Sequence, residues 1–259
     1  MLLLTAADVA MARSIPLPPP RPAPPAAAIV PNGSDSAQPS ACRLRLTADV
    51  AIAPSLPPIT GPGECEATDV VRLEAVVLSD RSRVAITPAA ILRCTMAEAI
   101  ATWVREEAAP RTLELGSALK AVENLTSFDC RGRNGAVGGR LSEHGKANAL
   151  DIHSLKLTNG KVIELTDPHV PADFRDGLRK SACARFTTVL GPGSDGFHED
   201  HVHVDLLERR GGYRICEWDV REPGEVLAAR ASVTSVPLPR VRPAIDSRGG
   251  DAVTARHSR

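Results

Sequence analysis

The sequence predicts an α+β domain with a central antiparallel sheet and flanking helices. Alternating polar and apolar residues, the pattern of half-buried strands, occur at 71–78 and again at 83–87. Helical periodicity is found at 95–110 and at 172–185. Hairpin signals between neighbouring strands favour antiparallel pairing, and a chain of 259 residues is long enough for one sizeable core.

The first half of the folded region supplies a hairpin, a helix and a third strand. The strands at 71–78 and 83–87 are predicted to pair as the hairpin. A capping box, with Thr95 at the N-cap and Glu98 at N3, predicts a helix that starts there and ends near Pro110. A short strand at 118–122 then leads into a glycine-rich loop.

The second half begins with another hairpin. An Asn-Gly pair at 159–160 separates two alternating runs, 155–157 and 161–165, which is a strong hairpin signal. The helix at 172–185 follows, and a strand is predicted at 187–190. Further strands are expected within two histidine-containing stretches described below.

Both ends of the sequence differ in composition from its centre. Residues 1–12 end in an Ala-x-Ala pattern and are expected to be a truncated signal peptide. Residues 13–40 are rich in proline and are expected to form an extended linker. The folded domain is predicted at 41–222, and residues 223–259 are expected to be a disordered tail rich in proline and arginine.

Composition argues against several functions. The formal net charge is zero, which argues against a general nucleic-acid binder. Aromatic residues make up only 3% of the chain, so a stacking surface for bases or a large aromatic platform for sugars is not expected. No apolar run is long enough for a transmembrane segment. The sequence leaves the oligomeric state open.

Six cysteines are spread singly along the chain, without a CxxC pair. This dispersal argues against a cysteine zinc site and favours disulfides, so we expect export to the periplasm or cell envelope; six free thiols in a cytosolic protein are the alternative. Of the fifteen connectivities that six cysteines allow, we expect Cys94–Cys130, because a helix start and a strand end would meet if the two elements are antiparallel. Cys183–Cys216 and, by elimination, Cys42–Cys65 complete the set.

Four of the seven histidines lie in two short stretches, 141–151 and 198–205. Zinc prefers imidazole nitrogen and carboxylate oxygen, and a catalytic zinc has three protein ligands and an open position. A histidine and an aspartate from the first stretch, with a histidine from the second, would supply such a set. The sequence therefore predicts a zinc cleft.

Strand periodicity would bring the two stretches together. From His201 onward polar and apolar residues alternate, so His201, His203 and Asp205 share one strand face while the intervening valines face the core. Asp151 and His153 share a face in the earlier stretch. If the two strands lie side by side, Asp151 approaches His203, and the loop that carries His144 closes over them. A hydrogen-bonded core histidine remains the alternative for each single residue.

These residues resemble the signature of LAS-type zinc peptidases, which are D-Ala-D-Ala carboxypeptidases, their dipeptidase relatives and murein endopeptidases. The resemblance rests on His144 and Asp151, seven positions apart, and on a downstream run, His198-x-x-His201-x-His203, which is closest to the endopeptidase branch.

Three segments resemble, more narrowly, the extensin-like C-terminal domain family of bacteria. They are 142–151, Cys130-Arg131 and 182–186, and the resemblance covers about residues 41–220. It implies the peptidase-like fold and zinc chemistry.

The resemblance implies a role for each residue of the site. His144, Asp151 and His203 match the metal positions one for one. His198 matches the general base, a role that suits imidazole because its ordinary pKa lies near neutral pH. Arg131 matches the arginine that steadies a developing oxyanion.

Four neighbouring residues leave alternatives open. His201 is expected to orient water or substrate. Arg133 is a rival to Arg131, and His153 lies on the correct face to compete as a metal ligand. The peptidase pattern has a glycine at the position of Ala147, where glycine would permit a tight turn.

The resemblance therefore implies zinc-dependent hydrolysis of amide bonds in cell-wall peptides, with Zn2+ as cofactor and peptidoglycan or its stem peptides as partner. The alternative is a non-catalytic module that contains zinc and binds or supports the cell wall.

Overall fold

The computed structural model describes residues 39–136 and 139–220. The expected signal peptide at 1–12, nearly all of the linker at 13–40 and the tail at 223–259 lie outside the described residues. Among the helices of the described part, none combines the length and apolar character that a membrane crossing requires.

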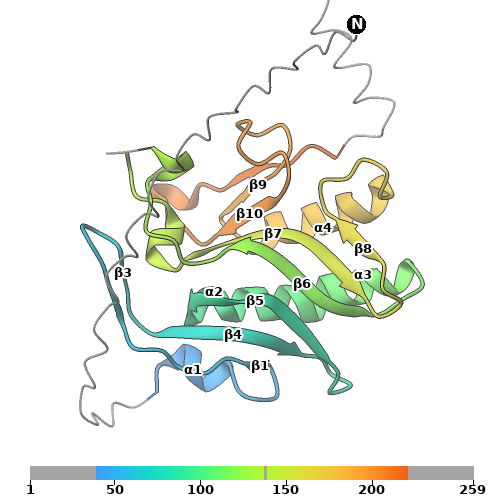
Figure 1. Cartoon of the computed structure of the whole chain (residues 1–259), viewed down its shortest axis with the longest axis horizontal. Helices are drawn as coiled ribbons and strands as arrows, with labels where there is room; N and C mark the ends of the chain where they lie inside the picture. The colour runs from blue at the N-terminus through green and yellow to red at the C-terminus, as the bar shows by residue number, and fades with distance from the viewer. Residues whose placement is uncertain (1–38, 137–138, 221–259) are drawn as a thin grey trace, which may run out of the picture. The chain divides into compact units, whose positions relative to one another are not determined.

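A mixed α+β arrangement is confirmed (Figure 1). The helices are α1 (Ala41–Arg45), α2 (Cys94–Trp103), α3 (Ala109–Glu114) and α4 (Ala172–Arg185). The strands are β1 (Ala51–Ile52), β2 (Ile59–Thr60), β3 (Glu66–Ala67), β4 (Val70–Val77), β5 (Arg83–Arg93), β6 (Leu119–Thr126), β7 (Ala149–Leu157), β8 (Val162–Glu164), β9 (Thr188–Leu190), β10 (Val202–Asp205) and β11 (Ile215–Glu217).

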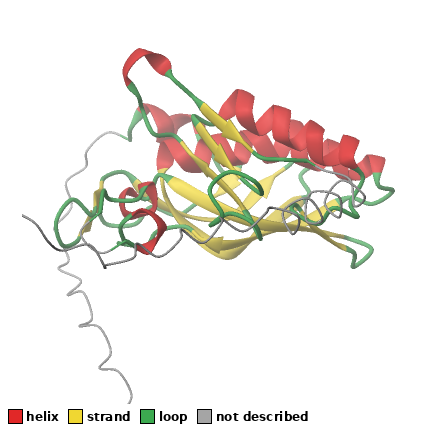
Figure 2. Cartoon of the chain, turned by 90° about the horizontal axis from the view of Figure 1, so that it is seen from above, coloured by secondary structure: helices red, strands yellow, loops and turns green. Residues whose placement is uncertain are grey.

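Nine of these strands form one sheet in the order β1-β4-β5-β6-β7-β10-β9-β11, with β8 paired to β7. Pairing is antiparallel except between β5 and β6 and between β9 and β11. The predicted hairpins are present as β4–β5 and β7–β8. The longer helices lie along one face of the sheet, which leaves the other face to loops (Figure 2).

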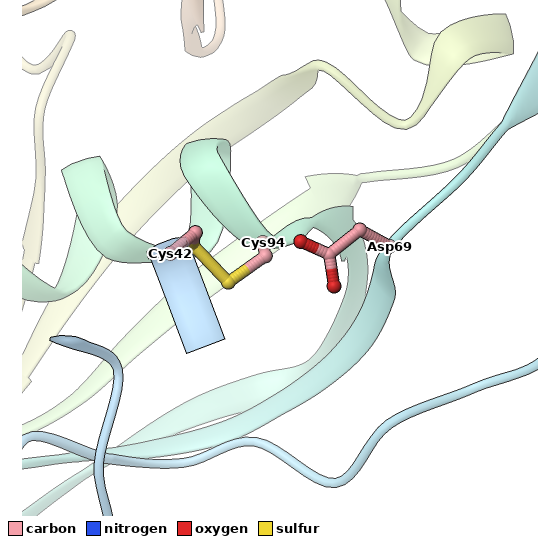
Figure 3. A group of neighbouring side chains, drawn as sticks. All are labelled: Cys42, Asp69 and Cys94. Atoms are coloured by element: carbon pink, nitrogen blue, oxygen red, sulfur yellow. A yellow bond between two sulfur atoms is a disulfide. The ribbon is translucent and has the colours of Figure 1, made fainter. Parts of the chain in front are cut away.

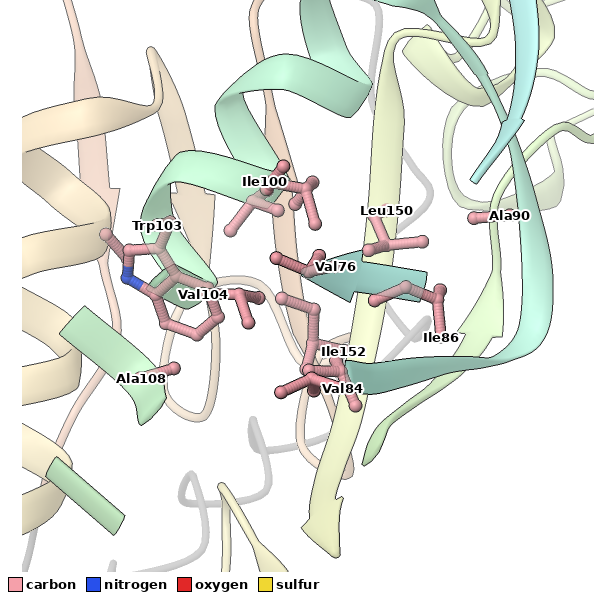
Figure 4. Packing of buried hydrophobic residues seen from close by; sticks show 14 of the residues in the cluster. Val76, Val84, Ile86, Ala90, Ile100, Trp103, Val104, Ala108, Leu150 and Ile152 are labelled. Carbon is pink, nitrogen blue, oxygen red and sulfur yellow. The ribbon is translucent and has the colours of Figure 1, made fainter. Parts of the chain in front are cut away.

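The main core lies between this helical layer and the sheet. Leu150 and Ile152 of β7 face Ile100, Trp103 and Val104 of the helical segment, and all five are at most 1% exposed (Figure 4). A fully buried side chain of this size stabilises the fold by about 1.5–3 kcal/mol. The main core therefore lies on one face of the sheet, and the histidine and aspartate side chains described below lie on the other face.

The helix predicted from Thr95 exists, but both of its predicted ends are wrong. Thr95 lies inside α2, whose N-cap is Arg93, and Glu98 forms an ion pair with Arg45 instead of closing a capping box. The helical path also passes Pro110. A π-helical segment, Val104–Ala108, joins α2 to α3, and Pro110 lies near the start of α3.

The three expected disulfides are present, but two pairings are wrong. Cys183–Cys216 is confirmed, whereas the other bonds are Cys42–Cys94 and Cys65–Cys130. Cys94 is fully buried at the start of α2, where the similarly buried Cys42 of α1 packs. Cys130 lies in the exposed loop after β6 and bonds to Cys65, which precedes β3. Cys94 and Cys130 thus belong to different packing environments.

Asp69 lies beside the Cys42–Cys94 bond (Figure 3). This grouping resembles a metal site by residue type only, because its sulfur atoms are joined to each other and a thiolate is the form that binds metal. Asp69 instead accepts a hydrogen bond from Ser40 Oγ at 2.6 Å. We assign this group to structure.

Candidate metal centre

Two neighbouring strands place two of the expected ligands directly opposite each other. β7 and β10 pair antiparallel with His203 opposite Asp151. Because side chains alternate along a strand, the flanking apolar residues of both strands enter the core while Asp151 and His203 point to the other face. His203 Nδ1 lies 2.9 Å from Asp151 Oδ1.

A single helical turn, Glu143–Lys146, supplies the third expected ligand. Ser142 caps the turn, since its Oγ accepts a hydrogen bond from the backbone N–H of His144. The turn ends at Ala147, whose φ of +51° lies in the left-handed region. Glycine adopts this conformation most readily, so the alanine preserves the turn that a glycine would favour.

The ligand atoms of the three residues converge. His144 Nε2 lies 3.1 Å from both Asp151 Oδ1 and His203 Nδ1. All three side chains are buried, at 1%, 3% and 7% exposure for His144, Asp151 and His203. We call His144, Asp151 and His203 the ligand trio.

The outer nitrogens of both imidazoles fix the protons of the trio. His144 Nδ1 lies 2.6 Å from the carbonyl oxygen of Ser127, which can only accept, so Nδ1 carries the proton and Nε2 presents its lone pair to the centre. His203 Nε2 likewise lies 3.2 Å from Asp205 Oδ2, an acceptor, so Nε2 carries the proton and Nδ1 presents its lone pair to the centre. Oxygen partners of this kind orient metal-binding histidines.

Three acceptor atoms at such distances need a positive charge between them. Two neutral imidazole nitrogens and one carboxylate oxygen are a donor set that suits zinc. Without a metal a proton fills this role. Burial opposes charge on His203, but hydrogen bonds with Asp151 and Asp205 raise the pKa of His203 to about 9. Burial likewise opposes charge on Asp151, yet hydrogen bonds from the two histidines hold the pKa of Asp151 well below its usual range.

His198 lies next to the trio, with its ring centre 5.6 Å from that of His203. Its Nδ1 is 2.6 Å from Asp195 Oδ1, so Nδ1–H donates to the carboxylate, and Nε2 is an acceptor without a hydrogen bond to the residues that the structure describes. Burial lowers the pKa of His198, and Asp195 opposes this effect only in part. The ring is therefore neutral at pH 7. A neutral imidazole held by a carboxylate has the form of a general base.

Asp195 was not identified from the sequence. The signal that could have found it is its position three residues before His198, in a loop with glycine at 193 and 196. Asp205 was placed on the correct strand face without a role. The Ser127 carbonyl had no signal in the side-chain sequence, because a backbone atom makes the contact.

The two other histidines occupy different places. His201 Nδ1 bonds to Asp200 Oδ1 at 2.7 Å, and its Nε2 lies 3.7 Å from Asp151 Oδ1, at the border of the trio. His153 shares the sheet face but bonds through Nδ1 to the backbone carbonyl of Asp200 at 2.9 Å. The structure groups His203, and not His153, with the other two ligand candidates.

A cleft of about 190 Å³ opens beside the trio. Both candidate arginines line it, and Arg131 is the nearer one, with Nη2 3.8 Å from Asp151 Oδ2 and Nε 2.8 Å from Asp129. The lining residues are Arg131, Arg133, Asn134, Ser142, Glu143, His144, Thr188, Leu190, Asp195, His203, Asp205, Arg209 and Ile215. Asp195, which is hydrogen-bonded to His198, is one of these lining residues.

Comparison with known proteins places the chain in a family. The family model described as extensin-like protein C-terminus matches residues 40–217, which span every helix and strand described above. Searches of curated proteins and of solved structures give no match. The chain therefore belongs to the extensin-like protein C-terminus family.

Proposed function

We propose that this protein is an exported zinc-dependent hydrolase of amide bonds in cell-wall peptides. One observation carries the proposal: three buried acceptor atoms converge within about 3 Å next to a histidine that is oriented by a carboxylate. A purely structural histidine cluster has no need of a separate, neutral imidazole beside it. The combination suits hydrolysis.

His144, Asp151 and His203 would hold the metal. A bound zinc ion supplies Lewis acidity, which lowers the pKa of water toward ~7 and polarises a carbonyl group. Ser127 and Asp205 keep the two imidazole lone pairs directed inward. The chain therefore supplies both the ligands and the partners that fix their tautomers.

Amide hydrolysis adds one water across the C–N bond, with the hydroxyl going to the acyl carbon and a proton to the leaving amine. His198 Nε2 accepts the proton of the attacking water and returns one to the amine, while Asp195 keeps the ring in place. Arg131, whose Nη2 lies 3.8 Å from Asp151 Oδ2, would donate to the oxyanion that develops on the carbonyl oxygen.

The substrate class follows from the resemblance to cell-wall peptidases, and the three disulfides suit an oxidising compartment such as the periplasm. The rival proposal is a wall-binding or structural module that retains zinc without catalysis. The two proposals differ in what happens to a peptide substrate, so a digest separates them.

Purified protein should release new amine termini from muropeptides, and a chelator should abolish the release. His198→Ala should keep its zinc and its fold while the rate falls about 10²–10⁴-fold, the usual contribution of general-base catalysis. His153→Ala is the matched control, since this residue lies on the same sheet face outside the trio. Zinc-loaded protein that releases no product would favour the structural module.

A further inference from the structure

The two imidazoles of the ligand trio are oriented by partners of different kinds. His144 Nδ1 donates to the backbone carbonyl of Ser127 at 2.6 Å, and a backbone atom is fixed by the fold itself. His203 Nε2 donates to the side chain of Asp205 at 3.2 Å. A side-chain carboxylate can rotate, so it orients an imidazole only if other groups hold the carboxylate in place. The tautomer of His203 therefore depends on what fixes Asp205.

β9 supplies the first group that fixes this carboxylate. β9 and β10 pair antiparallel with Thr188 opposite Asp205, which places the two side chains on the same face of the sheet. Thr188 Oγ1 donates to Asp205 Oδ1, and both residues are buried, at 3% and 4% exposure. The backbone N–H of Leu207 also donates to Oδ1, at 2.9 Å. Oδ1 is thus occupied, and Oδ2 is left to accept from His203.

Arg209 lies at the outer end of the same row of contacts. Its Nη2 donates to Thr188 Oγ1 at 2.7 Å, and its Nη1 donates to the carbonyl oxygen of Thr187 at 3.0 Å. The guanidinium is therefore held at two points on β9. Arg209, Thr188 and Asp205 all line the cleft beside the ligand trio. A positive group thus lies two hydrogen bonds away from the carboxylate that orients His203.

The donors and acceptors of these contacts fix the direction of every proton. A guanidinium can only donate, so Thr188 Oγ1 accepts from Arg209. A hydroxyl has one proton, and the carboxylate of Asp205 accepts it. The other oxygen of Asp205 accepts from His203 Nε2, which leaves Nδ1 as the nitrogen with a lone pair for a metal. Hydrogen bonds in such a chain polarise and strengthen one another.

We propose that Thr188 and Arg209 are positioning residues of the metal centre, which hold Asp205 in the orientation that keeps His203 ready to bind zinc. Each of them acts through Asp205 and not as a ligand. The inference rests on the proposed hydrolase function, because it concerns the metal centre of that function. It extends the site from the three ligands along one wall of the cleft.

Thr188→Val keeps the shape of the side chain and removes its hydroxyl. This variant should bind zinc about 10-fold more weakly, at the lower end of the effect of such outer partners, because Leu207 still donates to Asp205. Thr188→Ser keeps the hydroxyl and should restore most of the affinity. Thr112→Val is the matched control, since Thr112 is also buried but its hydroxyl donates to the Ala109 carbonyl in α3. Competition with a chromophoric chelator measures each dissociation constant.

Arg209→Met removes the guanidinium and keeps a long apolar stem. Zinc binding should weaken by about 3- to 10-fold, because Thr188 loses the donor that polarises its hydroxyl. Arg209→Lys should restore part of the affinity. Arg43→Met is the matched control, because Arg43 makes the same pair of contacts outside the cleft, to the Ala53 carbonyl at 3.1 Å and to Ser55 Oγ at 2.6 Å.

A spectroscopic measurement separates positioning from a purely structural role. Nuclear magnetic resonance of zinc-loaded protein with 15N-labelled histidine reports the proton on His203 Nε2. This proton should exchange with water faster in Thr188→Val and Arg209→Met, and at the wild-type rate in Thr112→Val and Arg43→Met. Thermal unfolding checks that each variant is folded. Should Thr188→Val fail to fold, the comparison of Arg209→Met with Arg43→Met decides.

The outcomes separate this inference from the hydrolase function. Weaker zinc binding in Thr188→Val with recovery in Thr188→Ser supports the inference, even if the zinc-loaded protein cleaves no muropeptide, a result that contradicts the hydrolase alone. Wild-type zinc affinity in both Thr188→Val and Arg209→Met would overturn the inference and leave the hydrolase standing. Equal weakening in the two control variants, or no recovery in Thr188→Ser, would also overturn the inference. A wild type that binds no zinc would overturn both.

Discussion

The two faces of β7 and β10 are equally buried but differ in how their side chains are satisfied. Leu150 is 0% exposed and packs among apolar neighbours, whereas Asp151, the next residue, is 3% exposed and faces two imidazoles. Val204 and His203 form the same contrast on β10. Packing completes the first face. On the second face three acceptor atoms converge, so this face needs a cation or a proton between them.

The largest expected change in stability comes from removing a buried side chain from the apolar face of β7. Leu150→Ala should lower the free energy of unfolding by about 2–5 kcal/mol, through lost transfer energy and the cavity that remains. Zinc bound per folded chain should not change, because the ligands lie on the other face. Denaturant unfolding and elemental analysis measure the two quantities. A loss of zinc from folded Leu150→Ala would show that the faces are coupled.

The next largest effect is expected in the pH dependence of the free energy of unfolding of chelator-treated protein, which depends on His203. The pKa of His203 is raised from 6.5 to about 9 in the folded state, so its stabilising contribution is complete below pH 6.5 and is lost as the pH rises through 9. The expected loss is on the order of 3 kcal/mol. His203→Gln should flatten the profile. A metal-free wild type that gains stability across this range would contradict the assignment.

Asp205→Asn alters the partner of one ligand without removing the ligand. An amide in this place can direct either its oxygen or its NH2 toward His203 Nε2, so it fixes the tautomer less strictly than the carboxylate. Zinc affinity should fall about 10- to 100-fold, as for other partners of metal-bound histidines. Asp200→Asn is the control, because that carboxylate contacts His201 outside the trio. Competition with a chromophoric chelator gives both dissociation constants.

The smallest effect is expected at Ala147. Ala147→Gly removes the backbone strain of an alanine with positive φ. It also removes a methyl group that is buried beside Ala67 and Val70 and increases the conformational entropy of the unfolded chain. These contributions oppose one another, so the free energy of unfolding should change by less than about 1 kcal/mol. Zinc affinity should stay the same. A weaker site in Ala147→Gly would show that the alanine itself shapes the turn.

The alternation of strand residues made the open face of the sheet predictable. Asp151 was expected beside His203, and the structure pairs them directly, because a two-residue period assigns every side chain of a strand to one face. The hairpins were predictable from the same alternation and, for the second hairpin, from the Asn-Gly turn at 159–160. No strand period relates a loop to a strand, so the grouping of His144 with this pair was expected from the clustering of the histidines, and the family resemblance agreed with it.

Features that depend on tertiary partners were not predictable. The capping box at Thr95 has the correct residue types, but Glu98 pairs with Arg45, which is distant in sequence. The disulfide prediction for Cys94 likewise lacked the position of α1, which brings Cys42 to it. Asp195 was missed because the contact depends on a loop that folds back on His198. Local sequence does not encode which distant group competes for a side chain.

Zinc content of three proteins tests the central claim most directly. Wild type, His203→Ala and His153→Ala should be purified without added metal, loaded with zinc, washed and measured by elemental analysis together with a circular dichroism check of folding. Because the ligand trio contains His203 and excludes His153, we expect one zinc ion per chain in wild type and in His153→Ala and none in His203→Ala. Full zinc in folded His203→Ala, or none in wild type, would contradict the assignment of this face as a metal centre.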